Sequence, residues 1–141
     1  MQFRPFGSTG LQVSAIALGG HEFGPQGQIR GFHEAFSQAV TRGNILPGFG
    51  QENRSRIVAA ALDLGINLFD LTIDSEKEAM GRLLSELSAA DEILIQTRPE
   101  GMVYGYDPQN RQMAQYDQLK AEVERICTLI RRDRVDILNL A

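Results

Sequence analysis

The segment ALDLGINLFDLTIDSEKEAMGRLL, residues 61–84, decides the fold. Its apolar run INLFD has strand length and follows Gly65, a residue type that commonly ends a helix. The next segment, residues 74–87, predicts a helix because Ser75 and Glu78 have capping-box spacing. The apolar residues of that helix recur on one side: Met80, Leu83, Leu84 and Leu87. A helix end, a strand and a second helix in this order indicate an alternating α/β fold.

The alternation continues on both sides of this segment. FRPFGSTGLQV near the N-terminus predicts a hairpin around a Ser-Thr-Gly turn. Buried-type strands are predicted in SAIALGG, EILIQT and RVDILNLA. Asn53 is expected to cap a helix through Leu64, and a long helix is expected over residues 111–131 with Tyr116 facing inward. The order, a hairpin followed by βαβαβαβ, predicts a parallel sheet with helical crossovers.

The chain is expected to form one domain, residues 1–141, with a long insert at about 22–50. The insert is rich in glycine, holds two prolines, and carries a short helical pattern around Phe32 and Phe36. The last predicted strand is not followed by a covering helix. We therefore expect either the rest of a longer protein or a second copy to complete the fold.

Composition excludes several functional classes. There are 14 Lys and Arg residues against 18 Asp and Glu, a net charge of -4, so a nucleic-acid partner is not expected. No signal-like N-terminus and no run of about 18 apolar residues is present, which predicts a cytoplasmic protein without a membrane segment. The single cysteine, Cys127, allows no disulfide and no cysteine zinc site, and it is expected in the core.

Four segments resemble the aldo-keto reductases, whose chains typically read close to YRxLGxTGLxVSxLGLGG and AxxxGINFFDTAxxYGxSExxLGxxL. The corresponding segments here are MQFRPFGSTGLQVSAIALGG, ALDLGINLFDLTIDSEKEAMGRLL, ILIQTRPEG and RRDRVDILNLA. The resemblance covers nearly the whole chain outside the insert. It implies a hairpin plus the N-terminal βαβαβαβ half of a TIM (β/α)8 barrel, with NADP(H) as cofactor and a small carbonyl compound as substrate.

The family reduces carbonyls with an Asp, a Tyr, a Lys and a His at the barrel mouth. Asp70 matches the Asp at the end of its strand. By position, Ser75 stands for the Tyr, Arg98 for the Lys and Ala141 for the His. Serine is far harder to ionise than a phenol, and a guanidinium does not exchange its proton. The usual reductase chemistry is therefore expected to be lost or altered, as in a pseudoenzyme.

Other residues after the strands are further candidates. Gly20, His21 and Glu22 follow the first parallel strand, where the family builds part of its cofactor and substrate pocket. Tyr104 and Tyr106 are candidates to replace the missing phenol, although aromatic packing of their glycine-containing loop is the favoured explanation. Arg98 with Asp70 could form a structural ion pair or bind an anionic substrate. The spacing of these residues matches no compact metal site, so no metal is expected.

Three functions remain open from the sequence. The first is an aldo-keto reductase relative that keeps NADP(H) with altered or absent reductase activity. The second is a lyase or isomerase on the same barrel, because barrels carry many chemistries. The third is a binding or regulatory subunit without catalysis, a role that the potassium-channel beta subunits of the family show is open to this fold. Cofactor binding separates the first from the second, and carbonyl turnover separates the first from the third.

Overall fold

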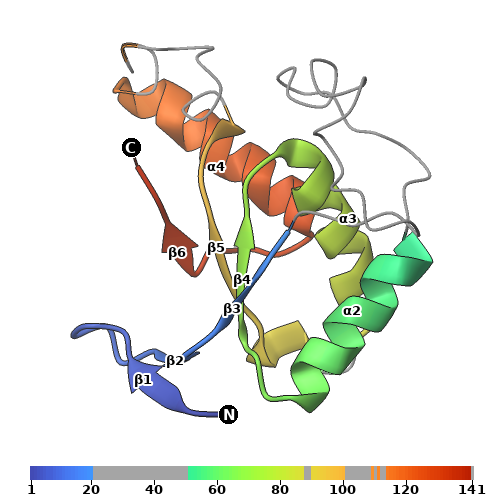
Figure 1. Cartoon of the computed structure of the whole chain (residues 1–141). Helices are drawn as coiled ribbons and strands as arrows, with labels where there is room; N and C mark the ends of the chain where they lie inside the picture. The colour runs from blue at the N-terminus through green and yellow to red at the C-terminus, as the bar shows by residue number, and fades with distance from the viewer. Residues whose placement is uncertain (21–50, 88–89, 101–108, 110, 112–113, 141) are drawn as a thin grey trace.

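The structure, a computed structural model, describes residues 1–20, 51–87, 90–100, 109, 111 and 114–140 (Figure 1). The side chains of residues 51 and 53 are also outside this description. The described residues form a four-stranded sheet with three α-helices and a separate two-stranded hairpin. The elements are β1 (Phe3–Pro5), β2 (Gln12–Ser14), β3 (Ala17–Gly19), α2 (Gln51–Asp63), β4 (Leu68–Leu71), α3 (Asp74–Leu84), a 3-10 turn (Ala90–Glu92), β5 (Leu94–Thr97), α4 (Tyr116–Ile130) and β6 (Ile137–Leu138).

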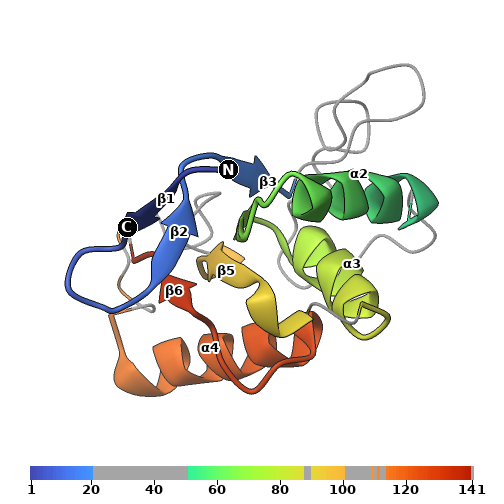
Figure 2. The ribbon, with the colours of Figure 1, turned by 90° about the horizontal axis from the view of Figure 1, so that it is seen from below.

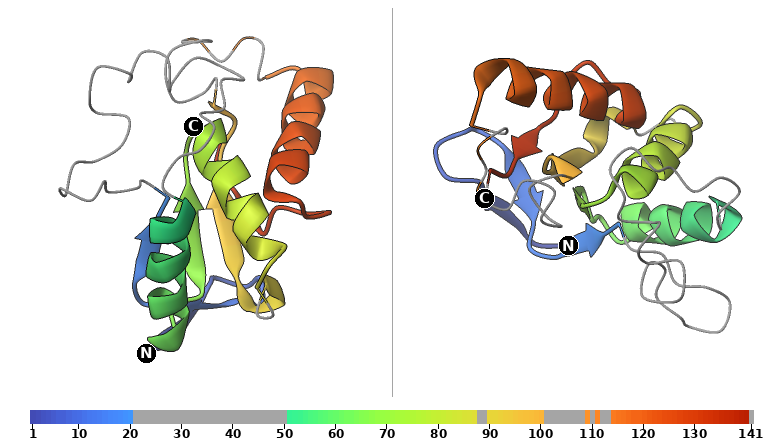
Figure 3. Two further views of the ribbon diagram at one scale, coloured as in Figure 1. Left: turned by 90° about the vertical axis from the view of Figure 1, so that its right-hand side faces the viewer. Right: turned by 90° about the horizontal axis from the view of Figure 1, so that it is seen from above.

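The sheet is parallel and its strands follow chain order, β3-β4-β5-β6. The three helices form an arc on one side of the strands when the molecule is seen from above or below (Figures 2 and 3). In the strand register, Gly19 lies beside Asp70 and Asp70 lies beside Gln96. The strands therefore end together at one edge, as the βαβαβαβ order predicts.

The predicted N-terminal hairpin is confirmed and lies at the end of the sheet where the strands begin (Figure 1). Asn67, just before β4, holds it in place. The Asn67 side chain accepts a hydrogen bond from the Ser14 amide at 2.8 Å and donates one to the Gln12 carbonyl at 2.9 Å. The hairpin is thus fastened by hydrogen bonds to the sheet it covers.

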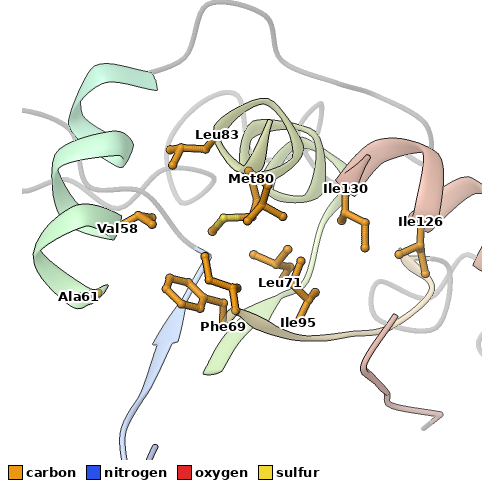
Figure 4. Packing of buried hydrophobic residues seen from close by; sticks show 11 residues of the cluster. Val58, Ala61, Phe69, Leu71, Met80, Leu83, Ile95, Ile126 and Ile130 are labelled. Atoms are coloured by element: carbon orange, nitrogen blue, oxygen red, sulfur yellow. The ribbon is translucent and has the colours of Figure 1, made fainter. Parts of the chain in front are cut away.

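The core fills the space between the sheet and the three helices (Figure 4). β4 alternates, so that Phe69 and Leu71 are fully buried while Leu68 and Asp70 are only partly buried. The helices meet them with apolar side chains, labelled in Figure 4 as Val58 and Ala61 from α2, Met80 and Leu83 from α3, and Ile126 and Ile130 from α4. The predicted apolar stripe of residues 80–87 is confirmed, with Leu87 partly buried at its end.

Glycine at position 81 lets α3 and α4 approach closely. A Cβ atom added to Gly81 would lie 2.1 Å from the carbonyl oxygen of Leu129, a separation that real atoms do not show. The obstacle is helix backbone, which cannot rotate away as a side chain could. This contact sets the spacing of the two helices that surround the buried charges described below.

Several predicted helix boundaries were wrong. α2 begins at Gln51, so Asn53 is inside the helix and is not its cap. At the start of α3 the Glu76 carboxylate accepts backbone N–H bonds from Thr72 at 2.6 Å and Ile73 at 3.4 Å. Glu76 therefore satisfies the free amides, in place of the predicted Ser75 and Glu78 pair. α3 also ends three residues early, at Leu84.

The inward orientation predicted for Tyr116 was also wrong. α4 begins at Tyr116, later than predicted, and this side chain is 76% exposed. It belongs to an open apolar groove beside β6, lined also by Leu119, Val123 and Leu138. Among the described residues β6 is the last strand of the sheet, so no further strand covers this side of α4 beyond Leu138. The helix predicted inside the insert lies outside the described residues.

Candidate functional site

The ion pair expected between Asp70 and Arg98 is present where β4 and β5 end. The Arg98 Nη2 atom donates to both carboxylate oxygens of Asp70, each at 3.0 Å. The position of Asp70 in this ion pair follows from strand alternation. Phe69 and Leu71 point toward the helices, so Asp70 points to the opposite face of the sheet. Both side chains remain partly accessible, Arg98 at 27% and Asp70 at 32%.

A third side chain, Gln96, completes this group. Gln96 lies beside Asp70 in the β4–β5 register, and its Nε2 atom donates to Asp70 Oδ1 at 3.1 Å. Sequence reasoning missed Gln96. Strand alternation could have identified it: Gln96 is two residues before Arg98, and residues two apart in a strand lie on the same face of the sheet. Asp70, Gln96 and Arg98 together are called the mouth group below.

The backbone around the mouth group is fixed by its own hydrogen bonds. Thr97 donates through its hydroxyl to the Leu71 carbonyl at 2.7 Å, joining the ends of β4 and β5. The Gly20 amide donates to the Asp70 carbonyl at 2.7 Å, and Arg54 donates to the Gly20 carbonyl at 2.6 Å. A Cβ atom at Gly20 would lie 2.8 Å from a carboxylate oxygen of Glu76. The candidate Gly20 therefore has a packing role here.

A second group of charged residues lies in the helix layer, at the start of α3. Lys77 is fully buried and donates from Nζ to Asp74 Oδ1 at 3.0 Å. Arg125 of α4 donates to Asp74 Oδ2 from Nε at 3.0 Å and from Nη2 at 2.7 Å. Glu100, also fully buried, accepts the Asp74 backbone N–H at 2.8 Å. Asp74, Lys77, Glu100 and Arg125 are called the buried group below.

The two carboxyls of the buried group are shifted in opposite directions. Burial alone would raise the pKa of Asp74, but attraction to Lys77 and hydrogen bonds from Arg125 and Lys77 outweigh it and lower this pKa below its ordinary value. Burial, and after it the negative charge of Asp74, raise the pKa of Glu100 to about 8. Around neutral pH, Asp74 is therefore ionised and Glu100 is mostly protonated.

The chain is similar to two solved structures of an aldo-keto reductase from Pseudomonas aeruginosa, at 25% and 26% identity and with TM-scores of 0.60 and 0.62. Each match covers 96% of this chain, and 44% and 45% of the other. The chain is related to the aldo-keto reductases. No protein-family model matches the sequence.

The relationship extends over only part of the known fold. A glycerol dehydrogenase from Gluconobacter oxydans matches in fold, with a TM-score of 0.64 and 22% identity, and 38% of its chain is covered. The chain thus spans less than half the length of these proteins. Its hairpin and four parallel strands correspond to half of an aldo-keto reductase barrel.

The other positions taken from the aldo-keto reductase pattern are placed as follows. Ser75 lies in the first turn of α3 and is buried, on the helix side of the sheet and not beside the mouth group. The remaining candidates lie outside the described residues: His21, Glu22, Tyr104, Tyr106 and Ala141. Within the described ranges, no three His, Cys, Asp or Glu side chains gather as metal ligands would. No helix in those ranges is long and apolar enough to cross a bilayer.

The buried group was missed as a unit by sequence reasoning, which treated Asp74 and Ser75 as helix-starting residues. Asp74 does begin α3, as predicted. Its partners Glu100 and Arg125 are 26 and 51 residues away along the chain. No local pattern marks such a contact, because it arises only when α3, α4 and the end of β5 pack together.

Proposed function

We propose that this chain provides the ligand-binding mouth of an aldo-keto reductase-like barrel, with the family's usual carbonyl reduction altered or lost. The ligands proposed are NADP(H) and a small, anionic carbonyl compound. The observation that carries the proposal is the Arg98–Asp70 pair at the ends of adjacent parallel strands, supported by Gln96. Barrel active sites assemble from side chains at these strand ends.

The chemistry of Arg98 favours binding over proton transfer. A guanidinium stays charged throughout the physiological pH range, so it cannot pass a proton as a tuned lysine can. Arg98 uses Nη2 for Asp70, while its buried Nε atom has no hydrogen-bond partner among the described residues. A buried donor without a partner is costly, and an oxygen atom from a bound molecule would satisfy it. Phosphate, carboxylate and carbonyl groups all carry such an oxygen.

The described mouth residues therefore fit a ligand that brings oxygen acceptors, as NADP(H) does. When bound, this cofactor supplies the hydride in the family's reaction. Arg98 would hold an acceptor atom of the ligand, Asp70 would keep the guanidinium oriented, and Gln96 would keep the Asp70 carboxylate in place. Positions 98 and 75 hold an arginine and a serine in place of the lysine and tyrosine that assist carbonyl reduction in the family.

The test is an NADPH titration by calorimetry, using the protein as its native gene encodes it. We expect micromolar binding, weakened about tenfold or more by Arg98→Met, because a charge-assisted hydrogen bond contributes about 1.5–3 kcal/mol. Arg134→Met is the matched control, since Arg134 is exposed and precedes β6 at the opposite end of the sheet. This control should bind NADPH as the unmodified protein does.

The alternatives give different results in the same experiment. Absence of NADPH binding up to about 1 mM rejects the cofactor proposal and leaves a non-redox enzyme or a binding subunit. Normal binding by Arg98→Met keeps the cofactor and rejects the role of Arg98. With NADPH bound, turnover of aldehydes and 2-oxo acids measures the remaining reductase activity. Arg98→Lys restores the family's residue type and should raise that activity only if another residue supplies the phenol's proton.

A further inference from the structure

The segment after β5 is attached at two successive points, first to β4 and then to the start of α3. Arg98 reaches Asp70 on the open face of the sheet. Two residues later, Glu100 accepts the backbone N–H of Asp74 at 2.8 Å in the helix layer. Residues 98–100 thus link the mouth group to the start of α3, and the residue between the two contacts, Pro99, is buried.

Glu100 is an unusual anchor because its carboxyl group has no cation of its own. One oxygen accepts the Asp74 N–H, and the other, Oε1, is buried without a hydrogen-bond partner among the described residues. Both cations of the group, Lys77 and Arg125, bond to the Asp74 carboxylate. A second ionised carboxylate at this place would lose its hydration and face the negative charge of Asp74.

We propose that Glu100 is a proton-controlled latch, which in its neutral form holds residues 98–100 against the start of α3 and in its ionised form loosens that contact. The charges that act on its carboxyl come from α3, namely Asp74 and Lys77. On α4, Arg125 bonds to Asp74, and the buried Glu122 lies on the same helix. Because Arg98 belongs to the held segment, release changes the position of the guanidinium at the mouth. The latch does not depend on which ligand the mouth binds.

The pH range of the latch follows from the Glu100 carboxyl. Its pKa is raised from 4.5 to about 8, chiefly by burial, so the folded chain binds more protons than the unfolded chain between these values. The stability associated with neutral Glu100 is complete below about pH 4.5 and decreases as the pH rises toward 8. The contact should therefore loosen on the alkaline side of neutrality.

The direct measurement is an NMR titration of the purified chain between pH 5 and 10. The side-chain carboxyl carbon of Glu100 and the backbone amide of Asp74 should shift together, with a common midpoint near 8. In Glu100→Gln the amide of Asp74 should no longer titrate in this range, because glutamine keeps the carbonyl acceptor but has no ionisable proton. A Glu100 midpoint near 4.5 in the unmodified chain would overturn the proposal, and this result does not require any variant to fold.

Urea unfolding gives an independent check with a matched control. The ratio of folded to unfolded protein in Glu100→Gln, relative to the unmodified chain, should increase more than about tenfold between pH 5 and 8. Glu124→Gln removes an exposed carboxylate from α4 and should show no such increase. If Glu100→Gln and the unmodified chain have parallel pH profiles, Glu100 does not control the contact.

Discussion

Asp70 and Asp74 lie four residues apart on either side of one turn, yet they contact the segment after β5 in different surroundings. Asp70 is partly open to solvent and bonds to a guanidinium that is also partly exposed. Asp74 is buried and bonds to the buried Lys77 and to the partly exposed Arg125. Its backbone N–H donates to a second acid, Glu100. The difference arises because β4 turns Asp70 to the open face, while Asp74 begins the helix that covers the other face.

Charged side chains at these strand ends are therefore expected to have two different roles, ligand binding when they are exposed and folding when they are buried. An exposed ion pair contributes little to stability, typically below 1 kcal/mol, and is free to exchange its partner for a ligand. Buried charges depend on one another, because removing one partner leaves another charge without solvation. We therefore expect changes in the buried group to affect folding and changes in the mouth group to affect binding.

The largest effect is expected from Lys77→Met, which removes the one fully buried cation of the buried group. Methionine fills a similar volume, but Asp74 would keep only Arg125 as a charged partner. The free energy of unfolding at pH 7 should decrease by about 4 kcal/mol. Urea denaturation followed by circular dichroism measures it.

Lys120→Met is the matched control for this substitution. Lys120 also pairs with an acid, Glu124, but both side chains are more than half exposed. Its effect should stay within about 0.5 kcal/mol in either direction. Equal losses for the two lysines would mean that burial does not distinguish the two environments.

An intermediate effect is expected from Asp74→Asn. Burial still raises the pKa of Glu100 in this variant, but the negative charge that raises it further is gone, so the pKa should fall and more of Glu100 should be ionised near Lys77. Because Glu100 then compensates part of the lost charge, the free energy of unfolding should decrease by only about 2 kcal/mol. The carboxyl NMR titration reports the shift. An unchanged Glu100 pKa would show that the two acids do not interact.

Sequence and structure agree best where the signal is local. The strand at INLFD and the helix stripe of Met80, Leu83 and Leu84 follow from periodicity alone. The Asp70–Arg98 pair was also predictable, because parallel strands end together and the family resemblance placed both residues. Tyr116 was misplaced because helical periodicity alone does not show that β6 is the last strand of the sheet among the described residues, which leaves this side chain exposed.

The buried group was beyond prediction for a physical reason. Glu100, Asp74 and Arg125 come from three separate segments of the chain, and their contact depends on how closely α3 approaches α4 at Gly81. In the sequence each of these acids and bases has the character of an ordinary surface residue, because most such residues are exposed. Packing alone makes them interdependent, and the same packing raises the pKa of Glu100.

The smallest effect on stability, and the sharpest test of the comparison, is expected from Asp70→Asn. Its pair with Arg98 is partly exposed, so the free energy of unfolding should change by less than about 1 kcal/mol. Asparagine keeps one oxygen for Gln96 and Arg98 but no longer neutralises the guanidinium, so Arg98 should attract anions more strongly. We therefore expect inorganic phosphate, titrated by calorimetry at low salt, to bind more tightly to Asp70→Asn than to the unmodified chain. The double variant Asp70→Asn with Arg98→Met should lose this gain. A loss of stability as large as that of Lys77→Met, without any gain in phosphate binding, would mean that the mouth pair is structural and that both acids serve the fold alone.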